Sequence, residues 1–310
     1  MIEINSLTKL YGRVIGVNDI DVTLKPGAYG LLGPNGSGKT TLLNLMTGQL
    51  NPTLGSVRVL GCNPRANSDY FSRVGYCPAV DGLYSNVTGH EWVTYLLQLQ
   101  GWRIRDASQQ AEEMMNLVGM RPAMHRALGT YSRGMRQRTK LAQAFSHDPE
   151  LLILDEPFNG LDPMSRHQMT KLLRNWIEQG KYLILASHIL HEVESITKSF
   201  LLICGGRLLA SGSATDVHEI LTDVPNDIQI RCERGRELAA LIAGVEGVAS
   251  LKLEDDDRLL TVSTHNPRLV YEQLPAWISE RDLKINELQS ADESLQSLFN
   301  SLMRIHRGEV

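Results

Sequence analysis

One glycine-rich stretch decides the fold of this 310-residue chain: Gly33-Pro34-Asn35-Gly36-Ser37-Gly38-Lys39-Thr40. It fits the pattern G-x-x-x-x-G-K-[ST], follows the apolar run 28–32 and precedes the helical pattern 39–47. Glycines let successive backbone N–H groups turn towards phosphate oxygens, and the next helix adds its positive N-terminal end. Lys39 would bring a cation to the β- and γ-phosphates, and Thr40 a hydroxyl to Mg²⁺. The stretch predicts a nucleoside-triphosphate site but leaves kinase, GTPase, helicase and transporter functions open.

Strand-sized apolar runs surround this stretch, and the main ones are 28–32, 151–154, 182–186 and 199–204. Such runs suit a sheet that is covered on both faces, and helical patterns follow the first three of them. Between about 80 and 146, three helical patterns follow one another without strands, at 91–99, 106–118 and 134–145. We therefore predict a largely parallel α/β core over residues 1–221, with a helical subdomain inserted at about 80–146.

A different pattern follows residue 221. Strand-like and helical segments alternate in the order β-α-β-β-α-β, at 228–233, 235–243, 248–253, 259–264, 267–279 and 284–288, with an extra helix at 292–302. This order is typical of a ferredoxin-like unit, so we predict an α+β domain at 222–310 with a regulatory or dimerisation role. Asp255-Asp256-Asp257 falls between two of its strands, as a solvated hairpin turn would, and an ion site is the alternative.

Composition and charge limit the class of protein. Hydrophobic residues make up 42% and charged residues 21% of the chain, which is ordinary globular composition and argues against disorder. The formal net charge of −4 disfavours a nucleic-acid partner. The four cysteines form no C-x-x-C pair, so we expect neither a disulfide framework nor a zinc site. Because no secretory signal and no apolar run of about 20 residues is visible, we expect a cytoplasmic chain that does not itself cross the membrane.

A second apolar run ends in two carboxylates: Leu151-Leu152-Ile153-Leu154-Asp155-Glu156. It resembles a Walker B strand, in which the first acid holds Mg²⁺ and the second orients the attacking water. Asp155 would then lie opposite Thr40 at the metal, and Glu156 would polarise the water. A strand followed by an acidic surface turn is the alternative that this run alone leaves open.

Further motifs narrow the choice. Pro157-Phe158-Asn159-Gly160-Leu161-Asp162 follows directly, and upstream lies Tyr131-Ser132-Arg133-Gly134-Met135-Arg136-Gln137-Arg138. Ser187-His188 ends another apolar run, and Tyr11 precedes Lys39 by 28 residues. In this order the motifs resemble the D-loop, signature, switch histidine and adenine-stacking aromatic of the ATP-binding cassette (ABC) ATPases. The resemblance covers residues 1–220, and the form Tyr-Ser-Arg-Gly-Met resembles cassettes that serve ABC-2-type exporters.

The resemblance implies a P-loop ABC ATPase core with ATP and Mg²⁺ as its ligands. It assigns to the nucleotide the residues Tyr11, Gly33, Pro34, Asn35, Gly36, Ser37, Gly38, Lys39, Thr40 and Thr41. It assigns Mg²⁺ to Thr40 and Asp155, catalysis to Glu156 and His188, and the D-loop to Asp162. The signature residues Ser132, Arg133, Gly134 and Met135 would contact ATP held by a partner cassette, with Arg133 in place of the usual glycine.

Ala79 departs from the family pattern, which usually has glutamine at this position, near Mg²⁺ and the attacking water. Alanine supplies no polar side chain there. A lost neutral hydrogen bond is worth about 0.5–1.5 kcal/mol, so we expect hydrolysis slowed roughly three- to tenfold. An ATP-binding regulatory cassette with weak or no hydrolysis is the alternative.

The resemblance predicts a subunit that hydrolyses ATP to drive transport, with export favoured. Its partners would be a separate transmembrane permease and a second cassette, a homodimer being favoured over a heterodimer, on the cytoplasmic face of the cell membrane. A soluble, non-transport ABC protein is a further alternative. Two observations disfavour this alternative: the chain has one phosphate loop and one signature, and it shows no sustained heptad repeat of a coiled coil.

Apolar and aromatic residues follow Ala79, namely Val80, Leu83, Tyr84, Val87 and Trp92. They suit either the core of the helical subdomain or a groove that receives a short helix of the membrane subunit. We expect Leu83 and Tyr84 to be exposed because they lie in the loop.

Overall fold

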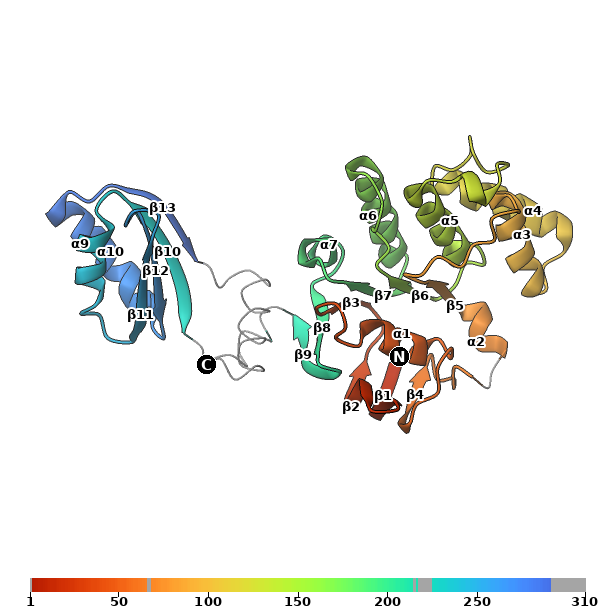
Figure 1. The fold of residues 1–310 in the computed structure, drawn as a ribbon, viewed down its shortest axis with the longest axis horizontal. Helices are drawn as coiled ribbons and strands as arrows, with labels where there is room; N and C mark the ends of the chain where they lie inside the picture. The colour runs from red at the N-terminus through yellow and green to blue at the C-terminus, as the bar shows by residue number, and fades with distance from the viewer. Residues whose placement is uncertain (1, 66–67, 214–215, 217–224, 291–310) are drawn as a thin grey trace. The chain divides into compact units, whose positions relative to one another are not determined.

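The computed structural model describes residues 2–65, 68–213, 216 and 225–290 (Figure 1). The chain divides into two compact units, 1–211 and 212–310, and each is described by itself. The predicted boundary at 221/222 and the helix predicted at 292–302 lie outside the described residues. Across the described part of the chain, no helix combines the length and the apolar character that spanning a bilayer requires.

A six-stranded sheet forms the centre of the first unit. Its order is β5 (Val74–Cys77), β6 (Leu151–Asp155), β7 (Tyr182–Ser187), β3 (Ala28–Leu32), β8 (Ser199–Cys204) and β9 (Arg207–Ser213). The pairings from β5 to β8 are parallel. Every residue of β6 is buried, which explains why the sequence of this strand is continuously apolar up to its final aspartate.

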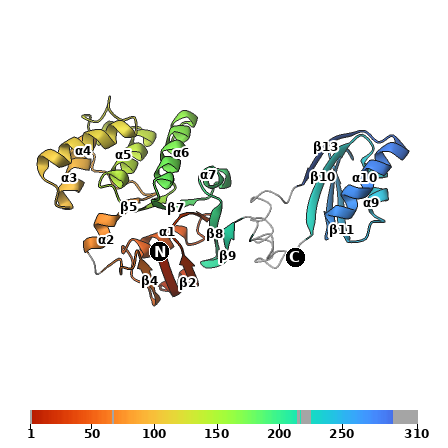
Figure 2. The same cartoon turned by 180° about the vertical axis from the view of Figure 1, so that it is seen from behind.

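An antiparallel sheet lies on one side of the central sheet. Its order is β2 (Val14–Leu24), β1 (Ile2–Tyr11) and β4 (Leu54–Val59). Helix α1 (Lys39–Met46) lies between the two sheets, as both views show (Figures 1 and 2). It contacts β2, β4 and β6. The buried side chains of α1 and both sheets form one hydrophobic core. The phosphate-loop stretch therefore joins β3 to a helix that is fixed on both sides.

The helices predicted between 80 and 146 are present. They are α3 (Gly89–Leu99), α4 (Ile104–Leu117) and α5 (Arg133–Phe145), with a 3₁₀ turn at Leu128–Thr130; a shorter helix, α2 (Ser68–Arg73), precedes β5. Thr88 caps α3, accepting a bond from the backbone N–H of Glu91, whose carboxylate accepts one from the Thr88 N–H. Helices α6 (Pro163–Glu178) and α7 (Leu190–Glu194) follow β6 and β7. In both views α5 and α6 lie on the face of the central sheet opposite the antiparallel sheet.

The second unit is ferredoxin-like. Its elements are β10 (Asn226–Cys232), α9 (Gly235–Ile242), β11 (Val248–Glu254), β12 (Leu259–Thr264), α10 (Pro267–Arg281) and β13 (Ile285–Ser290). The antiparallel sheet has the order β11-β12-β10-β13 and packs its own apolar core, which includes Ile228, Leu238 and Val270. The turn at 255–257 joins β11 to β12, and Asp255 and Asp257 pair with Arg231 and Arg236.

The packing of α5 against β5 yields a test of the fold. A Cβ atom at Gly75 would lie 2.1 Å from the carbonyl oxygen of Ala144, so Gly75→Ala forces strand and helix apart. We expect the first unit to lose about 1–3 kcal/mol of unfolding free energy, measured by urea denaturation. Gly82→Ala is the control, because a Cβ atom at Gly82 meets nothing within 4 Å. Equal stability of the two variants would contradict this packing.

Candidate active site

The phosphate-loop stretch opens onto a cavity of about 400 Å³. Its lining comes from the β1–β2 hairpin, the loop between β3 and α1, the start of α1, the loop after β5 and the end of β6 with the residue that follows it. The residues are Tyr11, Val14, Ile15, Gly16, Asn35, Gly36, Gly38, Lys39, Thr40, Thr41, Ala79, Asp155 and Glu156. Parallel pairing explains the convergence, because β3 and β6 both border β7 and end at the same edge of the sheet.

Two glycines give the phosphate loop its path. Gly36 and Gly38 have φ values of +79° and +107°, which side chains rarely adopt. A Cβ atom at Gly38 would also lie 2.4 Å from the carbonyl oxygen of Gly16, so the loop passes directly over the β1–β2 hairpin. Helix α1 begins at the next residue, Lys39, with its backbone N–H groups at the cavity.

Lys39 is the cation of the cavity. Its side chain is buried, and its ammonium donates to the carbonyl oxygens of Gly33 at 2.7 Å and Pro34 at 3.1 Å. Burial lowers the pKa of Lys39, whereas the negative charges of Glu156 and Asp155 act in the opposite direction. The loop thus holds a buried cation next to two acids.

Thr40 and Asp155 join the phosphate loop to β6. The Thr40 hydroxyl donates to Asp155 Oδ2 at 2.8 Å. Burial raises the pKa of Asp155, and the neighbouring Glu156 contributes to the increase. Asp155 Oδ1 is buried without a hydrogen-bond partner among the described residues. A buried carboxylate oxygen with no donor, next to a hydroxyl, fits a small divalent cation such as Mg²⁺, which prefers oxygen ligands.

Glu156 has a different backbone conformation from Asp155, the last residue of β6. It has a φ of +50°, and its N–H continues the pattern of the sheet by donating to the Ala186 carbonyl at 2.9 Å. Its carboxylate Oε1 lies 2.8 Å from Nδ1 of His188, the residue after β7. Glu156 therefore lines the cavity, and His188, which is not among the described lining residues, contacts its carboxylate.

The β1–β2 hairpin supplies an apolar wall. Tyr11, Val14 and Ile15 are 45%, 65% and 52% exposed and line the cavity beside the phosphate loop. A Cβ atom at Gly16 would lie 2.7 Å from the Tyr11 ring, so glycine permits this close approach. Sequence analysis found Tyr11 but missed the three residues from Val14 to Gly16. The signal that could have identified them is the apolar pair Val14-Ile15, followed by Gly16 and separated from Tyr11 by only two residues.

The signature residues fall outside the described lining of this cavity. Ser132 caps α5, its hydroxyl accepting a bond from the Met135 N–H at 3.3 Å. A Cβ atom at Gly134 would lie 2.7 Å from the carbonyl oxygen of Gly160, and the Arg133 stem covers Gly160. The signature and the 157–162 loop therefore form one surface. Asp162 caps α6, and a hydrogen bond from the Ser165 N–H lowers its pKa.

The loop after β5 differs from expectation at one residue. Leu83 is only 7% exposed, so the prediction that it is accessible was wrong: its side chain is buried although it lies in a loop. Tyr84 is 69% exposed, as predicted, and Val80 is 73% exposed. Trp92 is half-buried; its ring packs edge-on against Tyr84, and its N–H donates to Gln143 at 2.8 Å.

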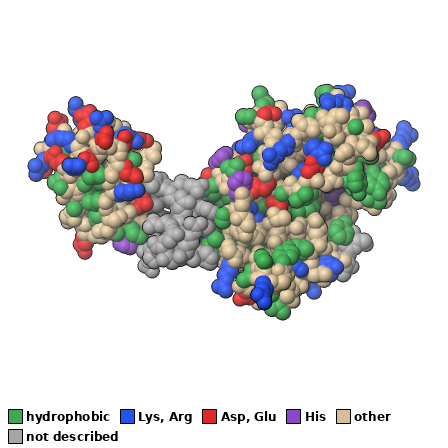
Figure 3. Space-filling model, in the orientation of Figure 1, with side chains coloured by type: hydrophobic (Ala, Val, Ile, Leu, Met, Phe, Trp, Pro, Cys, Tyr) green, Lys and Arg blue, Asp and Glu red, His purple; other side chains and the backbone are tan. Residues whose placement is uncertain are grey.

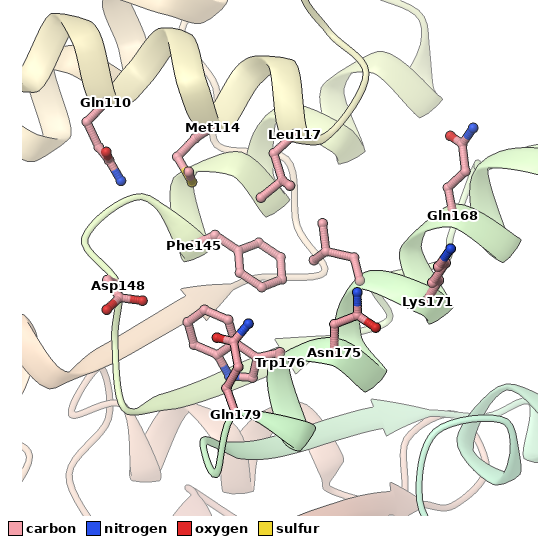
Figure 4. Close-up of a pocket in the computed structure, with 11 residues that line it drawn as sticks. Gln110, Met114, Leu117, Phe145, Asp148, Gln168, Lys171, Asn175, Trp176 and Gln179 are labelled. Carbon is pink, nitrogen blue, oxygen red and sulfur yellow. The ribbon is translucent and has the colours of Figure 1, made fainter.

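A second cavity of about 440 Å³ lies between α4 and α6 (Figure 4). Met114 and Leu117 approach it from α4, and Phe145 and Trp176 form its floor, with ring centroids 5.1 Å apart. The predicted site residues, all of which are described, lie elsewhere. Because its lining is mainly apolar and the phosphate loop opens onto the other cavity, we assign the chemistry to the cavity at Lys39 and Asp155.

Fold and site together define a nucleotide-binding α/β protein with a phosphate loop. The profile of the family described as "ABC transporter" matches residues 17–159. The chain is 37% identical to the bacitracin transport ATP-binding protein BcrA of Enterococcus faecalis, over 71% of each chain. It is 30% identical to the daunorubicin/doxorubicin resistance ATP-binding protein DrrA of Streptomyces peucetius, over 97% of this chain and 92% of that protein. This chain belongs to the ABC transporter family of ATP-binding proteins.

A solved structure gives the same result for the fold. The dimeric, post-hydrolysis structure of the ATP-binding cassette MJ0796, bound to ADP and Pi, superposes with a TM-score of 0.65 at 20% identity. It covers 69% of this chain and 98% of that chain. The shared part is therefore a complete cassette, and it supports the ABC ATPase fold of the first unit.

Proposed function

We propose that this chain hydrolyses ATP and thereby drives transport, with export favoured, through a separate transmembrane permease. The observation that carries the proposal is the convergence on one cavity of a buried cation, a Thr40–Asp155 pair whose second carboxylate oxygen has no partner among the described residues, and Glu156, whose carboxylate contacts His188. The names of the relatives, which speak of bacitracin transport and of daunorubicin and linearmycin resistance, favour export.

The residues divide the chemistry between them. Lys39 and the backbone N–H groups at the start of α1 bind the β- and γ-phosphates. Thr40 and Asp155 would hold Mg²⁺, which when bound neutralises charge on the phosphate oxygens. Glu156 accepts a hydrogen bond from the attacking water and orients it. His188 fixes the Glu156 carboxylate, and Tyr11 with Val14 and Ile15 offers an apolar wall to the base.

The signature residues need a second cassette. Ser132, Arg133, Gly134 and Met135 fall outside the described lining of the cavity that holds Lys39, so in our proposal they contact ATP bound to a partner cassette. We favour two copies of this chain. Figure 3 shows Lys and Arg side chains gathered over α5 and α6, and Arg133 at the start of α5 is exposed. A cation there suits the phosphates of a partner's nucleotide.

The membrane partner would dock beside Ala79. Val80 and Tyr84 expose large apolar side chains next to a residue of the ATP cavity, which suits an apolar helix of the permease. This arrangement makes the chain a peripheral protein on the cytoplasmic face of the membrane.

An ATP-binding regulatory cassette is the second candidate. Ala79 favours it, because this residue lines the cavity and brings no polar side-chain atom to it. Lys39, Asp155 and Glu156, which line the cavity, and His188, which contacts Glu156, support the active enzyme.

The second unit has its own core, and we propose that residues 222–310 stabilise the cassette pair or regulate its coupling to the permease. A chain shortened to 1–221 is then expected to retain basal ATP hydrolysis, while ATP-driven pairing, followed by sedimentation, becomes weaker. A soluble, folded 1–221 chain without basal hydrolysis would contradict this division.

Glu156→Gln tests the catalytic assignment. The amide keeps the shape of the side chain but removes the charge that orients water, so we expect turnover to fall about 100-fold or more while ATP binding persists. Phosphate release and calorimetric ATP affinity are the measurements. The control is Glu178→Gln, at an exposed position of α6. Unchanged phosphate release by Glu156→Gln would remove this residue from its proposed role.

Ala79→Gln separates the two candidate functions. If the chain is an active motor, glutamine adds a polar group near the water, and hydrolysis rises roughly three- to tenfold. The regulatory candidate predicts negligible turnover that glutamine cannot restore. Activity is measured in the complex with the membrane partner. Strong wild-type turnover that glutamine leaves unchanged would preserve the motor assignment and refute the effect ascribed to Ala79.

A further inference from the structure

A buried lysine in the middle of α5 has no role in the site described above. Lys140 is 4% exposed, and its ammonium donates to the carbonyl oxygens of Pro78 at 2.7 Å and Ala79 at 3.3 Å. It forms no ion pair with any carboxylate of the described residues. The only ammonium groups buried this deeply in the described chain are those of Lys39 and Lys140.

The burial of Lys140 is unfavourable for stability. A charge taken out of water costs free energy, and two carbonyl oxygens together with the more distant charges of Asp81 and Asp155 recover only part of that cost. An apolar side chain of similar length would fill the same space at a lower cost in folding free energy. The ammonium instead supplies two directional, charge-assisted hydrogen bonds, which attach the backbone of the loop after β5 to α5.

A second cation extends this attachment. Arg136, one turn before Lys140, donates to the carbonyl oxygen of Leu83 at 3.3 Å and pairs with Asp81. The two side chains therefore hold both ends of loop 78–83 on one face of α5. On the same helix, Gln137 donates to the carbonyl oxygen of Pro157 at 2.9 Å, directly after Glu156.

The helix that carries these groups begins at the signature. Ser132 caps it, and Lys140 follows about two turns later. Loop 78–83 in turn contains Ala79, which lines the ATP cavity, and exposes Val80. These bonds to the backbone would let the loop follow a displacement of α5 without any polar atom on the side chain of Ala79.

We propose that Lys140 is a positioning residue that makes loop 78–83 follow α5, so that the signature end of the helix sets the position of the loop. This inference rests on the proposed function, in which the signature meets a partner's nucleotide and the loop meets the membrane subunit. Lys140 is not among the described residues that line the ATP cavity, so in this proposal it acts through the backbone of Pro78 and Ala79.

The test compares Lys140→Met with Lys171→Met in the full chain. Methionine keeps the length of the side chain but loses the charge and the donors, and Lys171 is an exposed lysine of α6. For Lys140→Met we expect kcat to fall about tenfold with KM within about twofold, because positioning rather than binding is lost. The melting temperature is expected to stay level or rise, since a buried unpaired charge is removed. Lys171→Met is expected to change none of these quantities.

Hydrogen–deuterium exchange gives a readout that does not depend on hydrolysis. With ATP bound, the amides of residues 79–87 are expected to exchange faster in Lys140→Met than in wild type, while those of α1 exchange equally. If the wild type shows no turnover, the proposed function fails, and this comparison still decides the role of Lys140. Unchanged exchange in residues 79–87 would overturn the proposal. So would a joint fall in melting temperature, ATP affinity and kcat, which indicates a merely structural role.

Discussion

The bond between the Thr40 hydroxyl and Asp155 Oδ2 joins the two chain segments on which the site depends. Thr40 belongs to α1, which is fixed between two sheets, and Asp155 ends the fully buried strand β6. Parallel pairing of β3, β7 and β6 brings the phosphate loop, His188 and the two acids to one edge. A shift of either segment would separate the hydroxyl from the carboxylate and leave a second buried acid oxygen without a partner.

Burial sets the electrostatics of the site as strongly as charge does. It lowers the pKa of Lys39 and raises the pKa of Asp155, and in each case the opposite charge nearby offsets only part of the effect. The protein thus holds charges in a poorly solvated place before a ligand is bound. Groups fixed in this way need little reorganisation when phosphate charge arrives, which is the basis of electrostatic preorganisation in catalysis.

The sequence predicted the parts of the site that lie close together along the chain. The phosphate loop is local in sequence, and its glycines Gly36 and Gly38 indicate a backbone conformation that other residues rarely adopt. The apolar run before Asp155 indicated a buried strand. Contacts between distant segments were not predictable in this way. Gly16 contacts Tyr11 only because β1 and β2 pair as a hairpin, and Leu83 is buried although the local sequence predicts an accessible loop. The sheet of β2, β1 and β4 was not predicted, because its strands lack the continuous apolar runs of the central sheet.

Ala79 and Lys140 are best understood together. Among the described residues that line the ATP cavity, loop 78–83 contributes Ala79, whose side chain has no polar atom with which to contact the nucleotide. On its other side, the same stretch of backbone is held by a buried ammonium. In our proposal, the position of loop 78–83 is therefore set by α5, through Lys140, rather than by a contact of Ala79 with Mg²⁺. In this proposal, α5 connects Glu156 to the exposed residues Val80 and Tyr84. Gln137 of this helix bonds to the loop after β6, and Lys140 bonds to the loop after β5.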